Sequence, residues 1–309
     1  MPYPMQSRKD LMTIFNSAHF VLRHYARGYY PVSHSELTAL PVNRMFFPLE
    51  NPNGAENFIE DSFRRYPLIP GNLYFVPGFL PARFRLDARL YFLSIQTSLE
   101  IFPGVEFFSG CPRMLEIPFE KKRDELLRLF DSDPELQYPD ALKAGGLIFS
   151  ILTDMLDHYK PEDFWKPLAL RRYVHLTDYL HFQGNARTSV QELAELEHES
   201  RESFTRKFTA CTGITPKQLI DRFVTSRCLS LIGQGYRFKE VSEMLRFRDE
   251  FSFSRYFKRN MGESPRNWLI RQRLGCFLSF GIKLDFFLES AGNECILTPN
   301  LRTMRDQKR

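Results

Sequence analysis

The sequence predicts an α+β protein in two parts, an N-terminal antiparallel β-sandwich or barrel followed by an all-α region with two helix-turn-helix motifs. Three observations support this prediction. Short aromatic and branched runs separated by turn residues fill the first third of the chain. Helical periodicity replaces them from residue 119 onward. One stretch in the C-terminal half then repeats nearly the same pattern twice.

The first part, residues 1–118, contains many short runs of the kind found in strands. Turn residues at 51–54, 70–72 and 77–78 separate these runs. Closely spaced short strands favour an antiparallel sandwich or barrel. The predicted strands include residues 20–22, 44–47, 57–59, 73–76, 82–86 and 90–95.

The middle part, residues 119–164, has a helical pattern. Residues 118–130 and 141–159 are predicted helices, and the segment 131–134 interrupts the helical pattern between them. On the second helix Leu147, Ile151 and Met155 form one apolar stripe. Two interpretations stay open: the stripe joins two subunits, or it packs on the β module of its own chain.

Residues 189–268 contain the repeated pattern. A Phe-x-Arg-x-Phe string starts at Phe204 and again at Phe253, an offset of 49 residues. A Gly-x-[Ser/Thr]-Pro segment starts at Gly213 and again, with the same offset, at Gly262. Upstream, residues 189–194 match residues 237–242 at an offset of 48. A repeat of this length describes two copies of one supersecondary unit.

Each copy is predicted to form helix, turn and helix. In the first copy Thr188 or Ser189 caps a short helix, and Ser200 caps a second helix that buries Phe204 and Phe208. The glycine of the next segment ends that helix in the left-handed conformation, and the proline starts a new one. That connecting helix, residues 216–232, is roughly 25 Å long at about 1.5 Å per residue. It could hold two recognition helices about one DNA turn apart.

These strings resemble the DNA-binding domain of AraC/XylS-type transcription regulators. The second copy is the closer match, through Phe247-x-Asp249 and the string at residues 253–259. The resemblance covers residues 165–273 and implies a DNA-binding domain at residues 165–274. In the first part, residues 68–77 resemble the cupin-like sensor domain often fused to such DNA-binding domains. This second resemblance implies a small-molecule effector.

The distribution of charge agrees with a nucleic-acid partner. The formal net charge of the chain is only +5, but residues 165–275 hold 20 Lys and Arg against 12 Asp and Glu. A basic surplus confined to the C-terminal half predicts a surface that neutralises phosphates there.

Outward positions on the second helix of each copy are the candidate DNA contacts. Arg can donate to guanine O6 and N7, and Glu can accept from cytosine N4. Matching positions in the resembled family face bases or phosphates in the major groove. The base-contact candidates are Arg201, Glu202, Thr205, Arg206, Glu250, Phe251, Ser254 and Arg255. The phosphate-contact candidates are Lys207, Arg237, Lys239, Lys258 and Arg259.

Two features of these candidates allow other roles. Arg206 and Arg255 could pair with nearby carboxylates and serve the structure instead of DNA. Glu250 and Phe251 replace the small polar residues usual in the resembled family. The second copy could therefore hold the DNA backbone more than it reads bases.

The sequence argues against an enzyme or a membrane protein. It has no His-x-His pair, and His19, His24 and His34 are isolated, so we expect no metal, cofactor or catalytic site. Five scattered cysteines without C-x-x-C indicate reduced thiols. The chain has no signal-peptide pattern and no apolar run long enough to span a bilayer, which predicts a cytoplasmic protein.

Together these features predict a sequence-specific transcription regulator that binds double-stranded DNA, forms a homodimer and responds to a small molecule. A carbohydrate effector is favoured because the aromatic residues of the β module could stack on sugar rings. RNA polymerase is a further candidate partner. Two alternatives remain: a ligand-independent DNA-binding dimer, which a barrel filled by side chains would favour, and an enzyme, either cupin-type or a DNA-alkyl acceptor. Residues 275–309 have no assigned role.

Overall fold

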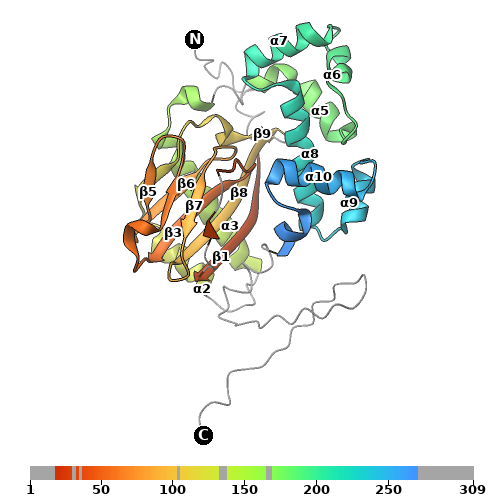
Figure 1. Ribbon diagram of the computed structural model, residues 1–309. Coiled ribbons are helices and arrows are strands. Elements are labelled where there is room, and N and C mark those ends of the chain that lie inside the picture. The colour runs from red at the N-terminus through yellow and green to blue at the C-terminus, as the bar shows by residue number, and fades with distance from the viewer. Residues whose placement is uncertain are drawn as a thin grey trace, which may run out of the picture.

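Figure 1 shows the computed structural model of the chain, in which a β-rich half lies beside a helical half. The structure describes residues 18–29, 33–34, 37–102, 105–131, 138–164 and 169–270. The predicted tail at residues 275–309 lies outside the described residues, as does the predicted end of the DNA-binding domain.

Two antiparallel sheets form the β-rich half. The large sheet has the strand order β1-β8-β3-β6-β10, with β9 paired to β8, and the small sheet has the order β2-β7-β4-β5. Both agree with the predicted antiparallel sandwich. The strands are β1 (His19–Tyr29), β2 (Ser33–His34), β3 (Asn43–Glu50), β4 (Phe58–Glu60), β5 (Arg65–Pro67), β6 (Asn72–Val76), β7 (Arg83–Leu86), β8 (Tyr91–Phe102), β9 (Val105–Glu106) and β10 (Leu115–Pro118).

The large sheet is covered on both faces. Along β8, Phe92 belongs to the core between the two sheets, whereas Leu93 and Ile95 belong to the core under the helices of the middle part. This alternation follows from the two-residue period of a strand. The β-rich half therefore has three layers, the small sheet, the large sheet and a helical layer.

The helical layer consists of α2 (Arg123–Asp131) and α3 (Tyr138–Asp154), followed by the short 3-10 helices η3 (Met155–His158) and η4 (Pro161–Phe164). Ile151 and Met155 of the apolar stripe are buried against the large sheet, and Leu147 packs beside them. The stripe therefore packs on its own β module. The predicted helix at 118–130 was wrong at its start, because Pro118 closes β10 and pairs with Asn72 of β6.

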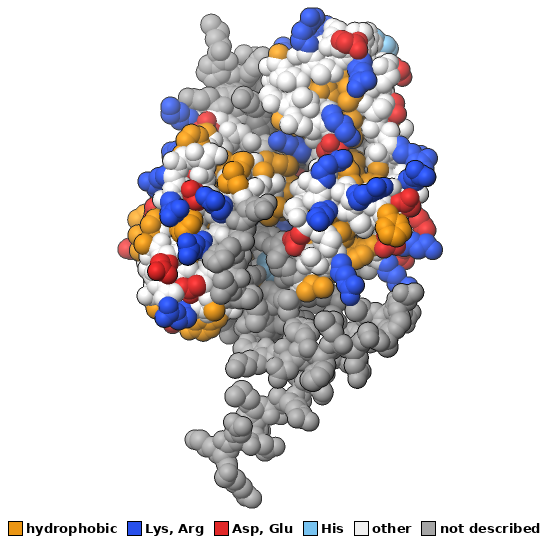
Figure 2. All heavy atoms as spheres, in the orientation of Figure 1, with side chains coloured by type: hydrophobic (Ala, Val, Ile, Leu, Met, Phe, Trp, Pro, Cys, Tyr) orange, Lys and Arg blue, Asp and Glu red, His pale blue; other side chains and the backbone are white. Residues whose placement is uncertain are grey.

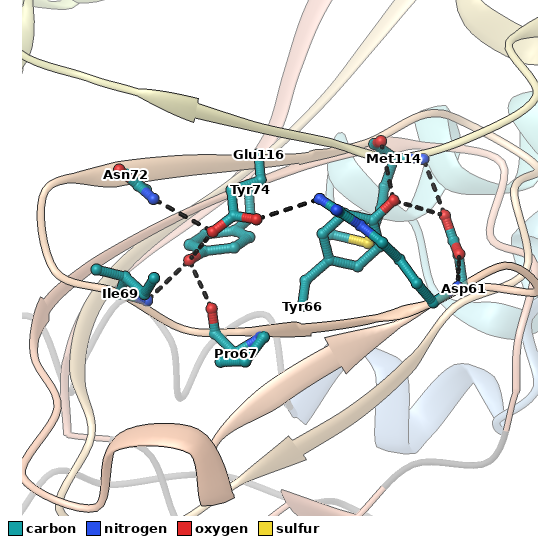
Figure 3. Close-up of polar contacts among 9 residues, drawn as sticks. Asp61, Tyr66, Pro67, Ile69, Asn72, Tyr74, Met114 and Glu116 are labelled. Atoms are coloured by element: carbon teal, nitrogen blue, oxygen red, sulfur yellow. Dashed lines mark hydrogen bonds and ion pairs between the residues drawn. The ribbon is translucent and has the colours of Figure 1, made fainter.

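Hydrogen bonds of buried polar groups connect the edges of the two sheets (Figure 3). The Asp61 carboxylate accepts a hydrogen bond from the Met114 amide at 3.2 Å. The Tyr74 hydroxyl accepts from the Ile69 amide at 2.8 Å and donates to the Pro67 carbonyl at 2.6 Å. Burial raises the pKa of Tyr74 to about 12, so its hydroxyl keeps the proton that this bond needs.

The helical half is arranged around one long helix. Figure 1 shows α8 running between α5, α6 and α7 on one side and α9 and α10 on the other. A 3-10 turn precedes the first of its α-helices. The elements are η5 (Ala169–Tyr173), α5 (Val174–Gln183), α6 (Val190–Leu196), α7 (Arg201–Thr212), α8 (Pro216–Gly233), α9 (Phe238–Met244) and α10 (Glu250–Met261).

One hydrophobic core joins these helices. Phe204 and Phe208 of α7, Phe223 of α8 and Phe253 of α10 all belong to it and are almost fully buried. The core also takes in residues from the end of the long strand β8 and from β9, as described below. The two copies of the repeat are thus one folded unit in contact with the β-rich half.

Candidate nucleic-acid interface

The first helix-turn-helix motif consists of α6 and α7, and each helix starts at a serine cap. Ser189 Oγ accepts from the Glu192 amide at 3.2 Å, and Ser200 Oγ accepts from the Ser203 amide at 3.2 Å. These bonds satisfy amides that the first helical turn leaves unpaired. Gly213 ends α7 with a left-handed φ of 74°. The caps predicted from the sequence are confirmed.

α7 buries one face and presents the other to solvent. Phe204 and Phe208, four residues apart, are buried in the shared core. Of the four base-contact candidates on this helix, Arg201, Glu202 and Arg206 are exposed and Thr205 is half-buried. The apolar stripe therefore turns the candidate residues outward.

The second motif, α9 and α10, repeats this design. Asp249 Oδ1 accepts from the Ser252 amide at 2.6 Å, and hydrogen bonding from Ser252 lowers the pKa of Asp249. Phe253 and Phe257 are buried, and Gly262 ends α10 with a φ of 77°. The carboxylate cap also suits the positive end of the helix dipole.

α10 carries the second set of base-contact candidates. Glu250, Phe251 and Arg255 are exposed, and Ser254 is half-buried. Among the described residues, neither Arg206 nor its counterpart Arg255 forms an ion pair with a carboxylate. After hydrogen bonding from Ser203 and Ser252, the charges of Arg206 and Arg255 also lower the pKa of Glu199 and Asp249. A structural role for these two arginines therefore stays an alternative.

The two motifs are fixed relative to each other. The Tyr256 hydroxyl of α10 donates to the Asp221 carbonyl of α8 at 2.8 Å. The Ala186 amide, ahead of the first motif, donates to the Leu245 carbonyl at the end of α9, at 2.9 Å. α8 itself has 18 residues, which makes it about 27 Å long. The candidate side chains of α7 and α10 are thus presented by one rigid body.

The phosphate-contact candidates lie on the surface of the same half. Figure 2 shows blue Lys and Arg side chains spread over the helical half of the visible face, with red acidic side chains among them. Lys207 Nζ pairs with Glu199 at 3.0 Å, and the Arg259 guanidinium lies 5.3 Å from the centre of the Tyr256 ring. All five candidates, Lys207, Arg237, Lys239, Lys258 and Arg259, are exposed.

Comparison with known proteins agrees with this geometry. A helix-turn-helix domain family matches residues 193–271. YobQ of Bacillus subtilis, described as an uncharacterized HTH-type transcriptional regulator, is 25% identical over 245 residues, which cover 79% of this chain and 90% of YobQ. The HTH-type transcriptional regulator RipA of Corynebacterium diphtheriae is 31% identical over 81 residues, 26% of this chain and 24% of RipA.

The whole two-part arrangement also has a counterpart among solved structures. ToxT of Vibrio cholerae, solved with an unsaturated fatty acid bound, aligns with a TM-score of 0.53 at 10% identity, covering 82% of this chain and 95% of ToxT. The fold predicted from the sequence is confirmed. The chain is a DNA-binding transcription regulator of the helix-turn-helix type.

In this helix-turn-helix regulator the β-rich half contacts the long helix that joins the two motifs. The Ser226 hydroxyl of α8 donates to Glu100 Oε1 at 2.6 Å, and Arg23 Nη2 of β1 lies 3.4 Å from the same oxygen. One turn earlier on α8, the Arg222 guanidinium lies 3.9 Å from the centre of the Phe79 ring. Sequence analysis missed these residues. The four-residue spacing of Arg222 and Ser226, which places both on one face of α8, was the available signal.

A buried carboxyl group lies at the same junction. Glu106 on β9 is 2% exposed and accepts from Asn43 Nδ2 and from the Leu99 amide, both at 2.8 Å. Burial raises its pKa to about 8, against the opposing effect of these hydrogen bonds, and burial lowers the pKa of Arg222 to about 10. A Cβ atom on Gly78 would lie 2.6 Å from Glu106 Cγ, so the carboxyl group fits only beside a glycine.

Two observations on the described residues bear on the enzyme alternatives. No three His, Cys, Asp or Glu side chains there gather closely enough to hold a metal ion. Burial raises the pKa of the Cys111 and Cys228 thiols, which opposes the thiolate that an alkyl acceptor needs. Within the same residues, no helix is both long and apolar enough to cross a bilayer. Both sequence relatives are described as HTH-type transcriptional regulators.

Proposed function

We propose that this regulator binds DNA by placing α7 and α10 in successive segments of the major groove, and that a small-molecule effector controls this binding. One observation supports the proposed DNA contacts. Arg206 on α7 and Arg255 on α10 occupy matching positions of the repeat, and both are exposed on helices that share one core. A length of about 27 Å for α8 is compatible with contacts about one DNA turn, roughly 34 Å, apart.

Each candidate residue has a role that follows from its chemistry. Arg206 and Arg255 donate to guanine O6 and N7, and Glu202 and Glu250 accept from cytosine N4. Arg201, Thr205 and Ser254 add polar contacts to neighbouring base edges or phosphates. The exposed basic side chains around the two helices bind backbone phosphates; these are Lys207, Arg237, Lys239, Lys258 and Arg259.

Arg206→Ala tests the base contact. We expect the variant to lose about 1–3 kcal/mol of binding free energy on a DNA duplex selected by the protein, because a bidentate contact to guanine is lost. On a scrambled duplex the loss should be small. Fluorescence anisotropy titrations at fixed salt measure both affinities. Lys239→Ala is the control, since a phosphate contact weakens binding equally on the two duplexes. An equal loss for Arg206→Ala would make Arg206 a phosphate contact as well.

The proposed effector site is a row of polar side chains between the two sheets. Gln96 of β8 pairs directly with His24 of β1 and with Arg44 of β3. These three side chains are 7%, 6% and 3% exposed. Directly paired residues point to the same face of a sheet. Phe92, four residues before Gln96 on β8, shows that this face looks toward the small sheet.

The other end of the space between the sheets is filled. Its core consists of packed side chains such as Tyr66, Leu68 and Tyr74. An effector is therefore proposed to bind at the polar end, beside Gln96, His24 and Arg44. The Arg44 guanidinium there also donates to the Leu80 carbonyl at 3.3 Å and lies 4.9 Å from the centre of the Phe84 ring. This donor set suits an oxygen-rich ligand such as a sugar, a sugar acid or a fatty-acid carboxylate. Because ToxT, which shares the fold, was solved with an unsaturated fatty acid, fatty acids belong among the candidates.

A thermal-unfolding panel tests the effector site. Sugars, sugar acids and fatty acids are added separately to the full-length protein and to the Gln96→Leu variant. We expect one class to raise the melting temperature of the wild type, because a ligand that binds only the folded state stabilises it, and to have little effect on Gln96→Leu. A ligand in the outer groove of about 470 Å³ beside Phe63 and Arg113 would stabilise both proteins equally. If no class stabilises the wild type, the ligand-independent alternative is favoured.

A route from this row to the DNA-binding half supports effector control. Ser98 and Glu100 follow Gln96 at two-residue steps on β8 and so share its face. Arg23 Nε donates to Ser98 Oγ at 3.0 Å, and Glu100 accepts from Ser226 of α8 at 2.6 Å. A ligand that shifts Arg23 or Glu100 would therefore change how α8 is held, and with it the placement of the two recognition helices.

The homodimer remains part of the proposal. Leu142 and Phe149 of α3 are 79% and 40% exposed, although the apolar stripe of this helix packs inward and the Phe149 ring also lies 5.6 Å from the Phe20 ring of β1. A pair of α3 helices from two subunits would cover these side chains. The molar mass of the full-length protein in sedimentation equilibrium tests this dimer. RNA polymerase is a further candidate partner. We expect the protein to act in the cytoplasm.

A further inference from the structure

One aromatic side chain on the second recognition helix has no packing role. Phe251 is 81% exposed in the first turn of α10, whereas Phe253 and Phe257 on the same helix are buried. Among the described residues, the Phe251 ring contacts no other aromatic ring. Single exposed apolar residues are common, so its position decides whether it has a function.

Phe251 lies on the face that carries the candidate DNA contacts. It precedes Arg255 by four residues, so the two side chains project one above the other from α10. The repeat offset of 49 places Glu202 of α7 at the position that matches Phe251. The first motif thus presents a hydrogen-bond acceptor where the second presents a phenyl ring.

The major groove offers one apolar group to such a ring. Among the base edges exposed there, only thymine carries a methyl group, and the other groups are hydrogen-bond donors and acceptors. A phenyl ring pressed against a donor or acceptor would desolvate it without a replacement hydrogen bond, which costs free energy. Against a methyl group the same ring buries apolar surface on both sides.

We infer that Phe251 contacts the methyl group of a thymine and makes the second motif select a T·A pair at one position of the DNA site. This inference rests on the proposed contact of α10 with the major groove. Since Glu202 at the matching position of α7 accepts from cytosine, the two motifs select different base pairs at equivalent positions. The DNA site is then asymmetric within one subunit.

Replacement of thymine by deoxyuridine tests the contact, because it removes only the methyl group. The probe is a duplex selected from a random library by the full-length protein, with each thymine replaced in turn. We expect one replacement to weaken wild-type binding about three- to fivefold, the effect of losing one buried methyl group. Phe251→Ala should bind the thymine and uracil forms with equal affinity, measured by fluorescence anisotropy.

Arg206→Ala is the matched control, since it should weaken binding while retaining the dependence on that methyl group. Because Phe251 is exposed, its Ala variant should melt at the wild-type temperature, which separates a lost contact from misfolding. The inference is overturned if no deoxyuridine replacement weakens wild-type binding, or if Phe251→Ala keeps the same penalty. If the library yields no selected duplex at all, the proposed function itself fails.

Discussion

Phe223→Ala is expected to lower the free energy of unfolding by about 3–5 kcal/mol, the range for removing a large buried aromatic ring. Phe223 is 1% exposed in the middle of α8. Its ring packs so closely on the end of α5 that a Cβ atom on Gly184 would lie 2.7 Å from it. The substitution leaves a cavity between two helices that neither can fill. Guanidinium titration followed by circular dichroism measures the loss.

The control for this substitution is Phe182→Ala. Phe182 is also at the end of α5, but its side chain is 81% exposed. Its removal should change the free energy of unfolding by less than about 0.5 kcal/mol. Similar losses in the two variants would mean that Phe223 does not fill the space between α5 and α8.

The stability of the protein is expected to depend on pH through Glu106. The raised folded pKa of about 8 means that the folded state holds a proton that the unfolded chain releases above its ordinary pKa. The resulting stabilisation is fully present below the unfolded pKa and is lost as the pH rises through 8. At about 1.4 kcal/mol for each unit between the two pKa values, the loss between pH 5 and pH 9 reaches up to about 4 kcal/mol.

Glu106→Gln isolates this contribution. The amide keeps an acceptor for Asn43 and cannot titrate, so the variant should lack this part of the pH dependence. Arg222, Glu100 and Arg23, the charged groups around Glu106, are present in both proteins. Guanidinium titrations at pH 5 and pH 9 measure the unfolding free energy of both proteins. The value for the wild type minus the value for the variant should fall as the pH rises. A difference that stays constant would show that Glu106 has the same protonation in both states.

The helical half was predictable in detail because its signals are local. Ser189, Ser200 and Gly213 act through neighbours within a few residues in the chain, and the spacing of Phe204 and Phe208 alone marks the buried face. The repeat then supplied the same information a second time. For these reasons the caps and the outward position of Arg206 could be derived before the structure, whereas its contact with a base stays a prediction.

The junction between the two halves was not predictable in the same way. Glu100 and Ser226 are 126 residues apart in sequence and meet only because the end of β8 reaches α8. Glu106 and Asn43 likewise come together through strand pairing in the large sheet. The sequence analysis also missed short strands that form only because a neighbouring strand pairs with them. Residues 115–118 are an example, because so few residues show no clear alternation of apolar and polar side chains.

The end of β8 and β9 have a practical consequence for biochemical dissection of the protein. Ile101 and Val105, both at most 2% exposed, belong to the hydrophobic core of the helical half. A truncation that starts at residue 169 would keep both recognition helices but remove these two side chains. The apolar surface of the helical half that they cover would then be exposed to solvent. Affinities measured on such a fragment would describe a partly loosened domain rather than the one that meets DNA in the intact chain.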